Sequence, residues 1–231
     1  MQWVFYLLAQ HPQVQDRLYE ELKGIEGADN VTQLHLLKGV MREALRLYPV
    51  APFLTRFLPQ DCVLGGYKIS SGQLIVMSLY TSGRDGKHFP EPDVFKPERW
   101  CRNEAGTYRG VGSPYAYLPF AMGARSCVGR KIAETQILLT LAEVVKRFKL
   151  SLVDSQPVEM VLELVAVPSR PITLHLTKRW QEHLTAKPDL RRCRETGHLG
   201  PDPRVKEGGP CNERTAGVED VILTVFQQQP L

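Results

Sequence analysis

The sequence has few cysteines, no long apolar run and no large excess of one charge. Its five cysteines are an odd number and form no CxxC pair, so neither a zinc site nor a small disulfide framework is predicted. No run of about 18 apolar residues occurs, and no transmembrane helix is predicted. The net charge of +4 on 231 residues is mild, whereas a nucleic-acid binder needs basic residues clustered on one face. These absences leave a globular protein with free thiols as the simplest class.

The chain is long and apolar enough, with a hydrophobic fraction of 43%, to bury a sizeable core. Apolar periodicity predicts a helix over residues 1–23 that is interrupted at Pro12, a helix over Gln33 to Leu47, and a strong helix from about Cys127 to Phe148. Short β-prone runs predict strands at 53–58, 67–70, 74–80, 150–153, 162–167 and 172–176.

The composition changes along the chain, and it separates residues 1–180 from residues 181–231. Residues 83–120 hold much of the glycine and proline and are expected to form an ordered meander, whereas residues 181–231 have mixed charge and little periodicity. The predicted fold class is mainly α with small β-sheets (α+β). We expect one domain over residues 1–180 and a disordered tail over residues 181–231.

The sharpest motif is FAMGARSCVG at 120–129, directly before the third predicted helix. A thiolate is needed for metal ligation or nucleophilic attack, and unpaired N–H groups at a helix N-terminus would stabilise the thiolate of Cys127. Gly123 and Gly129 would let the backbone approach a large flat ligand. Arg125 could bond an anionic substituent of that ligand. The competing interpretations are a buried, inert cysteine and a redox thiol.

Two arginines and a glutamate form a second pattern. Glu43 and Arg46 are one helical turn apart, a spacing so common that a surface ion pair is the alternative interpretation. The motif PERW at 97–100 adds Arg99. If Arg99 bonds Glu43 together with Arg46, the three side chains lock the meander onto the helix.

The order ExxR, PERW and FxxGxRxCxG resembles the signature of the cytochrome P450 family, over about residues 1–179. The resemblance implies heme b (iron protoporphyrin IX) as the cofactor, with Cys127 as the thiolate ligand of the iron, a ligand that favours O–O cleavage in this family. By the same resemblance Arg125 and Arg56 would hold heme propionates, Phe120 would shield the thiolate, and Gly123 and Gly129 would give the heme room. Glu43, Arg46 and Arg99 would be structural.

Within the family the chain resembles the mitochondrial class. Lys38 and Arg42, and likewise Arg130 and Lys131, match positions where that class binds an acidic ferredoxin, its electron donor. A solvated helix face is the alternative interpretation. The resemblance implies residence on the matrix side of the mitochondrial inner membrane, although the chain carries no targeting signal.

Residues 48–56, 58–61 and 78–85 resemble arthropod ecdysteroid 2-hydroxylases. This implies a monooxygenase that hydroxylates a lipophilic sterol substrate, which in that subfamily is an ecdysteroid. An apolar stretch would then form one wall of the substrate pocket, with ordinary strand packing as the alternative; its residues are Val50, Ala51, Pro52, Phe53 and Leu54.

The sequence departs from the family pattern in one respect that bears on activity. It contains no Ala/Gly-Gly-x-Asp/Glu-Thr motif and no WxxxR helix, so the threonine that guides protons to iron-bound dioxygen is absent. We therefore expect the C-terminal portion of the cytochrome P450 fold, which starts in mid-domain and is incomplete. A non-catalytic, truncated product that at most binds heme or ferredoxin is the alternative function.

Overall fold

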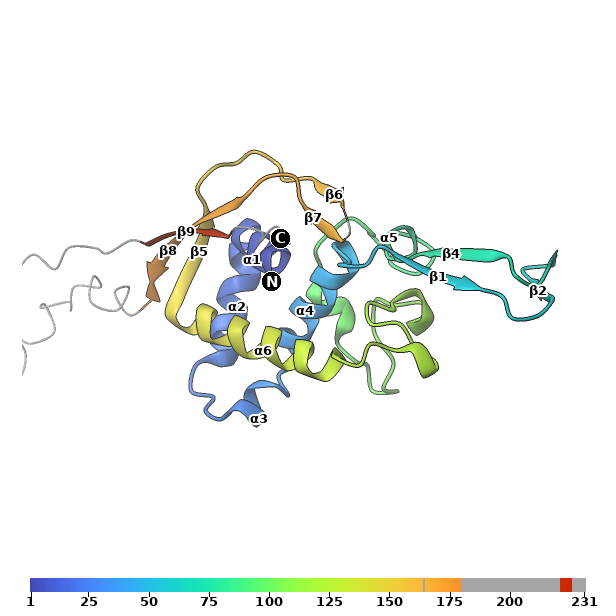
Figure 1. Cartoon of the computed structure of the whole chain (residues 1–231). Coiled ribbons are helices and arrows are strands. Elements are labelled where there is room, and N and C mark those ends of the chain that lie inside the picture. The colour runs from blue at the N-terminus through green and yellow to red at the C-terminus, as the bar shows by residue number, and fades with distance from the viewer. Residues whose placement is uncertain (164, 180–220, 226–231) are drawn as a thin grey trace, which may run out of the picture.

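The computed structural model describes residues 1–163, 165–179 and 221–225, and it is mainly helical with small antiparallel sheets (Figure 1). The α-helices are α1 (Gln2–Gln10), α2 (Pro12–Leu22), α3 (Ala28–Val31), α4 (His35–Leu47), α5 (Leu79–Ser82) and α6 (Arg130–Arg147). Single 3₁₀ turns are η1 (Pro97–Trp100), η2 (Pro114–Ala116) and η3 (Gly123–Arg125). The predicted fold class is confirmed. Within the described residues no helix is long and apolar enough to cross a membrane.

The strands of the described residues form four small sheets. β1 (Phe53–Phe57) pairs with β4 (Leu74–Ser78), β2 (Cys62–Leu64) with β3 (Tyr67–Ile69), and β6 (Met160–Leu162) with β7 (Ala166–Pro168). β8 (Ile172–Lys178) lies between β5 (Phe148–Leu152) and β9 (Val221–Val225). All pairs are antiparallel.

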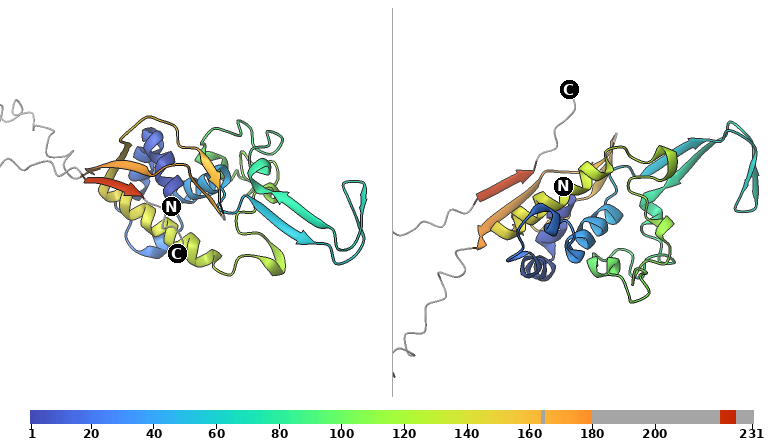
Figure 2. Two further views of the ribbon diagram at one scale, coloured as in Figure 1. Left: turned by 45° about the horizontal axis from the view of Figure 1, so that its top comes forward. Right: turned by 90° about the horizontal axis from the view of Figure 1, so that it is seen from below.

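The main core lies between the helices and the β5–β8 pair. Residues 3–9 of α1 are all buried, as expected for a helix that is apolar on every side. This helix packs against β5 and β8, while α6 packs across α2 and α4. The β1–β4 pair projects from this body with β2 and β3 at its tip (Figures 1 and 2).

The predicted helices are confirmed with shifted ends. The break at Pro12 separates α1 from α2, because proline is suited to the first turn of a helix. Between α2 and α4 lies the short helix α3, which follows Gly27 with φ at 83° and which the sequence does not predict. The sequence also does not predict β2.

The third predicted helix begins three residues later than expected. Gly129 is the N-cap of α6. Cys127 lies before it in a turn, and the Cys127 carbonyl accepts a hydrogen bond from the Arg130 N–H at 3.3 Å. Leu138 and Leu141 of this helix are buried, whereas Ile132 at its start is 74% exposed. The first turn of α6 therefore extends beyond the core.

One predicted strand is a hairpin. The run at 162–167 reverses direction, and Leu162 pairs with Ala166 across the turn between β6 and β7. No glycine, proline or asparagine marks this reversal, so the β-prone run gives no turn signal. The predicted tail at 181–231 lies outside the described residues, apart from the backbone of β9, which pairs with β8.

Candidate functional site

The predicted contacts among Glu43, Arg46 and Arg99 are present, and they are buried. The Glu43 side chain is 0% exposed. Its Oε1 accepts from Arg46 Nη2 at 2.7 Å and from Arg99 Nε at 2.8 Å. Its Oε2 accepts from Arg46 Nε at 3.0 Å and from Trp100 Nε1 at 2.8 Å. The Lys96 backbone N–H also donates to Oε1, at 3.0 Å. The alternative of a surface ion pair is wrong.

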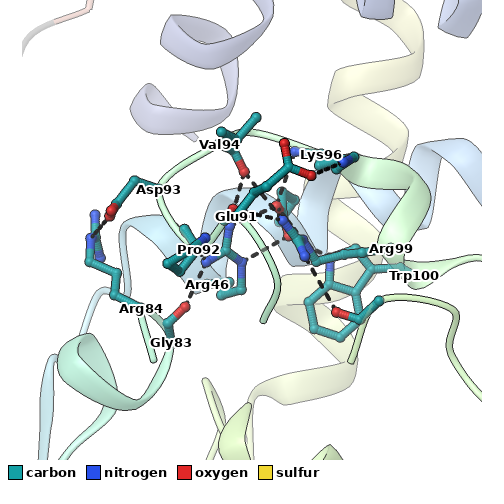
Figure 3. Close-up of polar contacts among 12 residues, drawn as sticks. Arg46, Gly83, Arg84, Glu91, Pro92, Asp93, Val94, Lys96, Arg99 and Trp100 are labelled. Atoms are coloured by element: carbon teal, nitrogen blue, oxygen red, sulfur yellow. Dashed lines mark hydrogen bonds and ion pairs between the residues drawn. The ribbon is translucent and has the colours of Figure 1, made fainter. Parts of the chain in front are cut away.

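Both guanidinium groups continue from this carboxylate to the backbone of the meander (Figure 3). Arg46 donates to the Gly83 carbonyl at 2.6 Å and to the Val94 carbonyl at 3.2 Å. Arg99 donates to the Pro90 carbonyl at 3.0 Å. Two arginines would be costly to bury alone, so each needs the carboxylate and these carbonyls. The network, called the Glu43 network below, thereby ties α4 to η1 and to the meander.

The helix α4 and η1 meet at Gly39. A Cβ at this position would lie 2.7 Å from the Pro97 carbonyl oxygen, closer than real Cβ atoms approach. Gly39 was not predicted from the sequence, and Trp100 of the PERW motif was assigned no role. A signal for Trp100 existed, because a buried indole N–H usually needs an acceptor.

The segment 120–129 forms an open loop before α6. The Cys127 N–H donates to the Phe120 carbonyl at 2.8 Å, which closes the loop. Gly123 has φ at 70°, a left-handed conformation that glycine adopts without strain, and it begins η3. The Cys127 thiol is free and exposed. The alternative of a buried cysteine is therefore wrong for this structure.

The charged and aromatic residues around the thiol differ in their partners. Arg125 is exposed and, within the described part of the chain, has no hydrogen-bond or ion-pair partner. Arg130 donates to Glu134 Oε1 at 3.0 Å, and its guanidinium carbon lies 5.8 Å from the ring centroid of the half-buried Phe120.

The residues around Cys127 suit a metal ion that is already bound within a cofactor. In the described residues no group of three or more His, Cys, Asp or Glu side chains could hold a bare metal ion. The single exposed Cys127 thiol would suit an iron whose other ligands are supplied by a porphyrin. The adjoining surface is open and apolar, because Val128 is fully exposed and Ile132 largely so. A Cβ at Gly129 would meet only the Cys127 Sγ, at 3.9 Å. The residues present therefore fit a heme.

The remaining predicted heme and substrate residues lie on and before β1. Arg56 is exposed and donates to the neighbouring Thr55 carbonyl at 2.6 Å. Among the described residues no hydrogen bond or ion pair joins it to the Cys127 loop. In the predicted substrate wall Pro52 is buried and Leu54 is half-buried, while three residues are exposed: Val50, Ala51 and Phe53.

The predicted ferredoxin-binding residues are partly engaged within the chain. Lys38 Nζ donates to Gln33 Oε1 at 2.9 Å, and the Arg42 guanidinium lies over the Tyr108 ring, 5.4 Å from its centroid. Lys131 is exposed at the start of α6.

The comparisons with known proteins agree with the motifs. The family model described as cytochrome P450 matches residues 1–176. The chain belongs to the cytochrome P450 family. It is 42% identical over 178 residues to "Cytochrome P450 315a1, mitochondrial" of Drosophila melanogaster, covering 77% of this chain and 32% of the relative. It is 38% identical over 182 residues to "Cholesterol side-chain cleavage enzyme, mitochondrial" of Hypanus americanus, covering 76% and 34%.

The fold agrees as well. A crystal structure of the cytochrome P450DA heme domain matches with a TM-score of 0.68 and 29% identity, covering 77% of this chain and 40% of that chain. The chain thus spans about a third of the length of the curated relatives that it matches. Both of these relatives are mitochondrial by name.

Proposed function

We propose that the chain is the heme-thiolate part of a mitochondrial-type cytochrome P450 monooxygenase that hydroxylates a sterol with electrons from a ferredoxin. The observation that carries this proposal is the free, exposed Cys127 thiol in the FxxGxRxCxG loop before α6. When bound, a thiolate-ligated heme supplies the activation of dioxygen.

The residues of the loop have distinct roles in binding heme b. Cys127 is the iron ligand, and the unpartnered Arg125 binds a propionate through a charge-assisted hydrogen bond. Phe120 covers one side of the thiolate, and Gly123 and Gly129 keep side chains away from the porphyrin. From β1, Arg56 would supply a second propionate contact once its own-strand hydrogen bond is replaced.

The proposed substrate is a sterol and, within that class, an ecdysteroid. Two relatives support a sterol substrate, because their names are "Sterol 26-hydroxylase, mitochondrial" and "Cholesterol side-chain cleavage enzyme, mitochondrial". The exposed side chains of Val50, Ala51 and Phe53 offer an apolar wall for such a molecule, together with Leu54. Pro52 is buried and would shape this wall through its backbone.

The electron donor is proposed to be an acidic ferredoxin that binds at Lys38, Arg42, Arg130 and Lys131. Basic side chains steer a transient encounter with an acidic protein. Lys131 is exposed and forms no ion pair within the described residues, whereas Arg130 would have to exchange Glu134 for the ferredoxin carboxylates. The matrix side of the mitochondrial inner membrane is the matching location.

A second candidate, a non-catalytic product that binds heme or ferredoxin, is favoured by one specific observation. The sequence has no Ala/Gly-Gly-x-Asp/Glu-Thr motif, so a side chain that moves protons in the family is absent. Heme ligation needs one side of the porphyrin, whereas monooxygenation also needs a closed pocket and a proton route. We expect no turnover by this chain alone with ferredoxin, its reductase and a sterol.

The heme proposal is tested by supplying heme during expression, reducing the protein and adding carbon monoxide. We expect a red-shifted Soret band that is lost in Cys127→Ser and kept in Cys101→Ser, since Cys101 is a half-buried thiol that is not part of residues 120–129. Heme uptake that is equal in Cys127→Ser and wild type would contradict the assignment. Sterol hydroxylation by the chain alone would contradict the role given to the missing threonine.

A further inference from the structure

The sheet of β5, β8 and β9 shows how this chain closes the edges of a strand pair. β8 is the central strand, since it pairs with β5 on one side and with β9 on the other. A free strand edge presents a row of unpaired N–H and C=O groups that can pair with another chain. Without β9, the β5–β8 pair would have one edge at β5 and one at β8, and these two edges are closed by different parts of the chain.

The edge at β5 is closed by a side chain of α2. Gln15 is 0% exposed, and its amide pairs with the backbone of Leu150 as a neighbouring strand would. The Leu150 N–H donates to Gln15 Oε1 at 2.6 Å, and Gln15 Nε2 donates to the Leu150 carbonyl at 3.0 Å. Both residues lie within residues 1–176, which the family model matches. The region shared with the family therefore closes this edge itself.

The edge at β8 is closed by a segment outside that region. β9 covers residues 221–225, beyond the last residue that the family model matches, and among the described strands it pairs with β8 alone. Figures 1 and 2 show it lying along β8. Its sequence is Val-Ile-Leu-Thr-Val, in which four of the five residues are β-branched and favour an extended strand. This edge is thus covered by a part of the chain that the family pattern does not supply.

The backbone of β8 divides its hydrogen-bonding groups between its two neighbours. The N–H of Val153, directly after β5, donates to the Thr173 carbonyl at 3.2 Å, so the backbone groups of Thr173 face β5. Successive residues of an antiparallel strand direct these groups to opposite sides. The groups of Leu174 therefore face β9, where the register places Leu223 opposite. The residues that face β9 in this way, called the outer edge of β8 below, are Ile172, Leu174 and Leu176.

β8 is held in place independently of β9. The side chains of its outer-edge residues belong to the main hydrophobic core, in which β8 contacts α1 and β5. β9, in contrast, has a strand partner on only one of its sides within the described residues. The two strands are therefore not equivalent: β8 is part of the body, and β9 is added to it.

We propose that the outer edge of β8 is a strand-binding site, and that residues 221–225 occupy it as a detachable ligand within the chain. The class of ligand is an extended peptide of β-prone residues, which binds to a sheet edge through main-chain hydrogen bonds. While β9 is bound, it prevents this edge from pairing with another chain. The proposal depends neither on heme ligation by Cys127 nor on a sterol substrate, so each can fail without the other.

The test is residue-resolved amide exchange by NMR on the full chain and on two proline variants of β9. Leu223→Pro removes an N–H that faces β8. Thr224→Pro is the matched control, because it removes an N–H that faces away from β8, which an edge strand tolerates. We expect Leu223→Pro to accelerate exchange at the outer edge of β8 by about tenfold or more. The amides of Thr173 and His175, which face β5, should be unchanged, and Thr224→Pro should match wild type.

A synthetic peptide tests whether the site binds its ligand in trans. Excess peptide with the sequence of residues 219–227 should restore slow exchange at the outer edge of β8 in Leu223→Pro, and a peptide of scrambled sequence should not. Failure of the first peptide, or equal exchange in the two proline variants, would overturn the proposal. Faster exchange at Thr173 and His175 as well would overturn it, since β9 would then be an inseparable part of the sheet. Wild-type protection that rises with protein concentration would overturn occupancy within one chain and identify strand exchange between two copies.

Discussion

The Glu43 network and the Cys127 loop are both predicted from short motifs, but the first is buried in the structure and the second is exposed. In the Glu43 network every charged group is buried and has partners on α4, η1 or the meander. In the Cys127 loop the thiol and Arg125 are exposed, and neither has a side-chain partner within the described residues.

This difference in burial indicates that the two regions have different roles. A buried charge network holds only if it is complete, because each missing partner leaves an uncompensated charge. An exposed thiol and an exposed guanidinium can instead bind a group that is not part of the chain. The Glu43 network thus serves the fold of the chain itself, whereas the role proposed for the Cys127 loop is to bind heme.

The largest predicted effect comes from breaking the Glu43 network at its centre. Glu43→Ala would leave Arg46 and Arg99 buried without a counter-charge, and we expect a loss of about 3–5 kcal/mol in the free energy of unfolding by urea. Glu98→Ala is the control, since Glu98 forms an exposed pair with Arg17 and should cost about 0–1 kcal/mol. Equal losses in the two variants would remove the distinction between network and surface pair.

A smaller effect is expected where α4 touches η1. Gly39→Ala would place a Cβ 2.7 Å from the Pro97 carbonyl oxygen and should cost about 1–3 kcal/mol, because two backbone segments must separate. Gly86→Ala meets nothing within 4 Å and should be close to neutral. Thermal unfolding of both variants checks the difference, and a neutral Gly39→Ala would show that the contact is loose.

Trp100 tests the neutral donor of the network. Trp100→Phe removes the indole N–H that donates to Glu43 at 2.8 Å, and we expect a loss of about 1.5 kcal/mol beyond the change in packing. Trp3→Phe is the matched control, because the buried Trp3 Nε1 has no partner among the described residues. If urea unfolding shows the same loss in both variants, the hydrogen bond to Glu43 contributes nothing.

The smallest effect is expected at the exposed pair of Asp154 and Arg170, which has the chemistry of the network without its burial. The hydrogen bond from Arg170 lowers the pKa of Asp154 below its ordinary value. The stabilisation is therefore present above the ordinary carboxyl pKa and is lost as the pH falls through the lowered one. The stability difference between wild type and Asp154→Asn should shrink as the pH falls from about 7 to about 3; a difference that grows would contradict the cause assigned to the shift.

The sequence predicted the fold class and the contacts of Glu43 with Arg46 and Arg99, but neither the burial of these side chains nor the hydrogen bond from Trp100. The helical spacing places Glu43 next to Arg46. By contrast, Arg99 and Trp100 follow Glu43 in the sequence by 56 and 57 positions, respectively. Local periodicity carries no information on such distances. Gly39 was missed for the same reason, since its neighbour Pro97 belongs to a distant segment.

The Cys127 loop shows the converse case. Its motif predicts the reactive thiol, but the start of α6 was placed too early, because the apolar pattern continues through Val128 and Ile132, which the structure leaves exposed. An apolar periodicity indicates what a helix can bury, and it does not indicate whether the partner surface lies within the described chain.

The contrast between a complete network and an open loop is tested most directly by amide hydrogen exchange with and without heme. We predict slower exchange in residues 120–130 on heme binding, no change in residues 43–46 and 96–100, and loss of the effect in Cys127→Ser. Protection of the Glu43 network by heme, or unchanged exchange in residues 120–130 of a heme-loaded chain, would contradict this division.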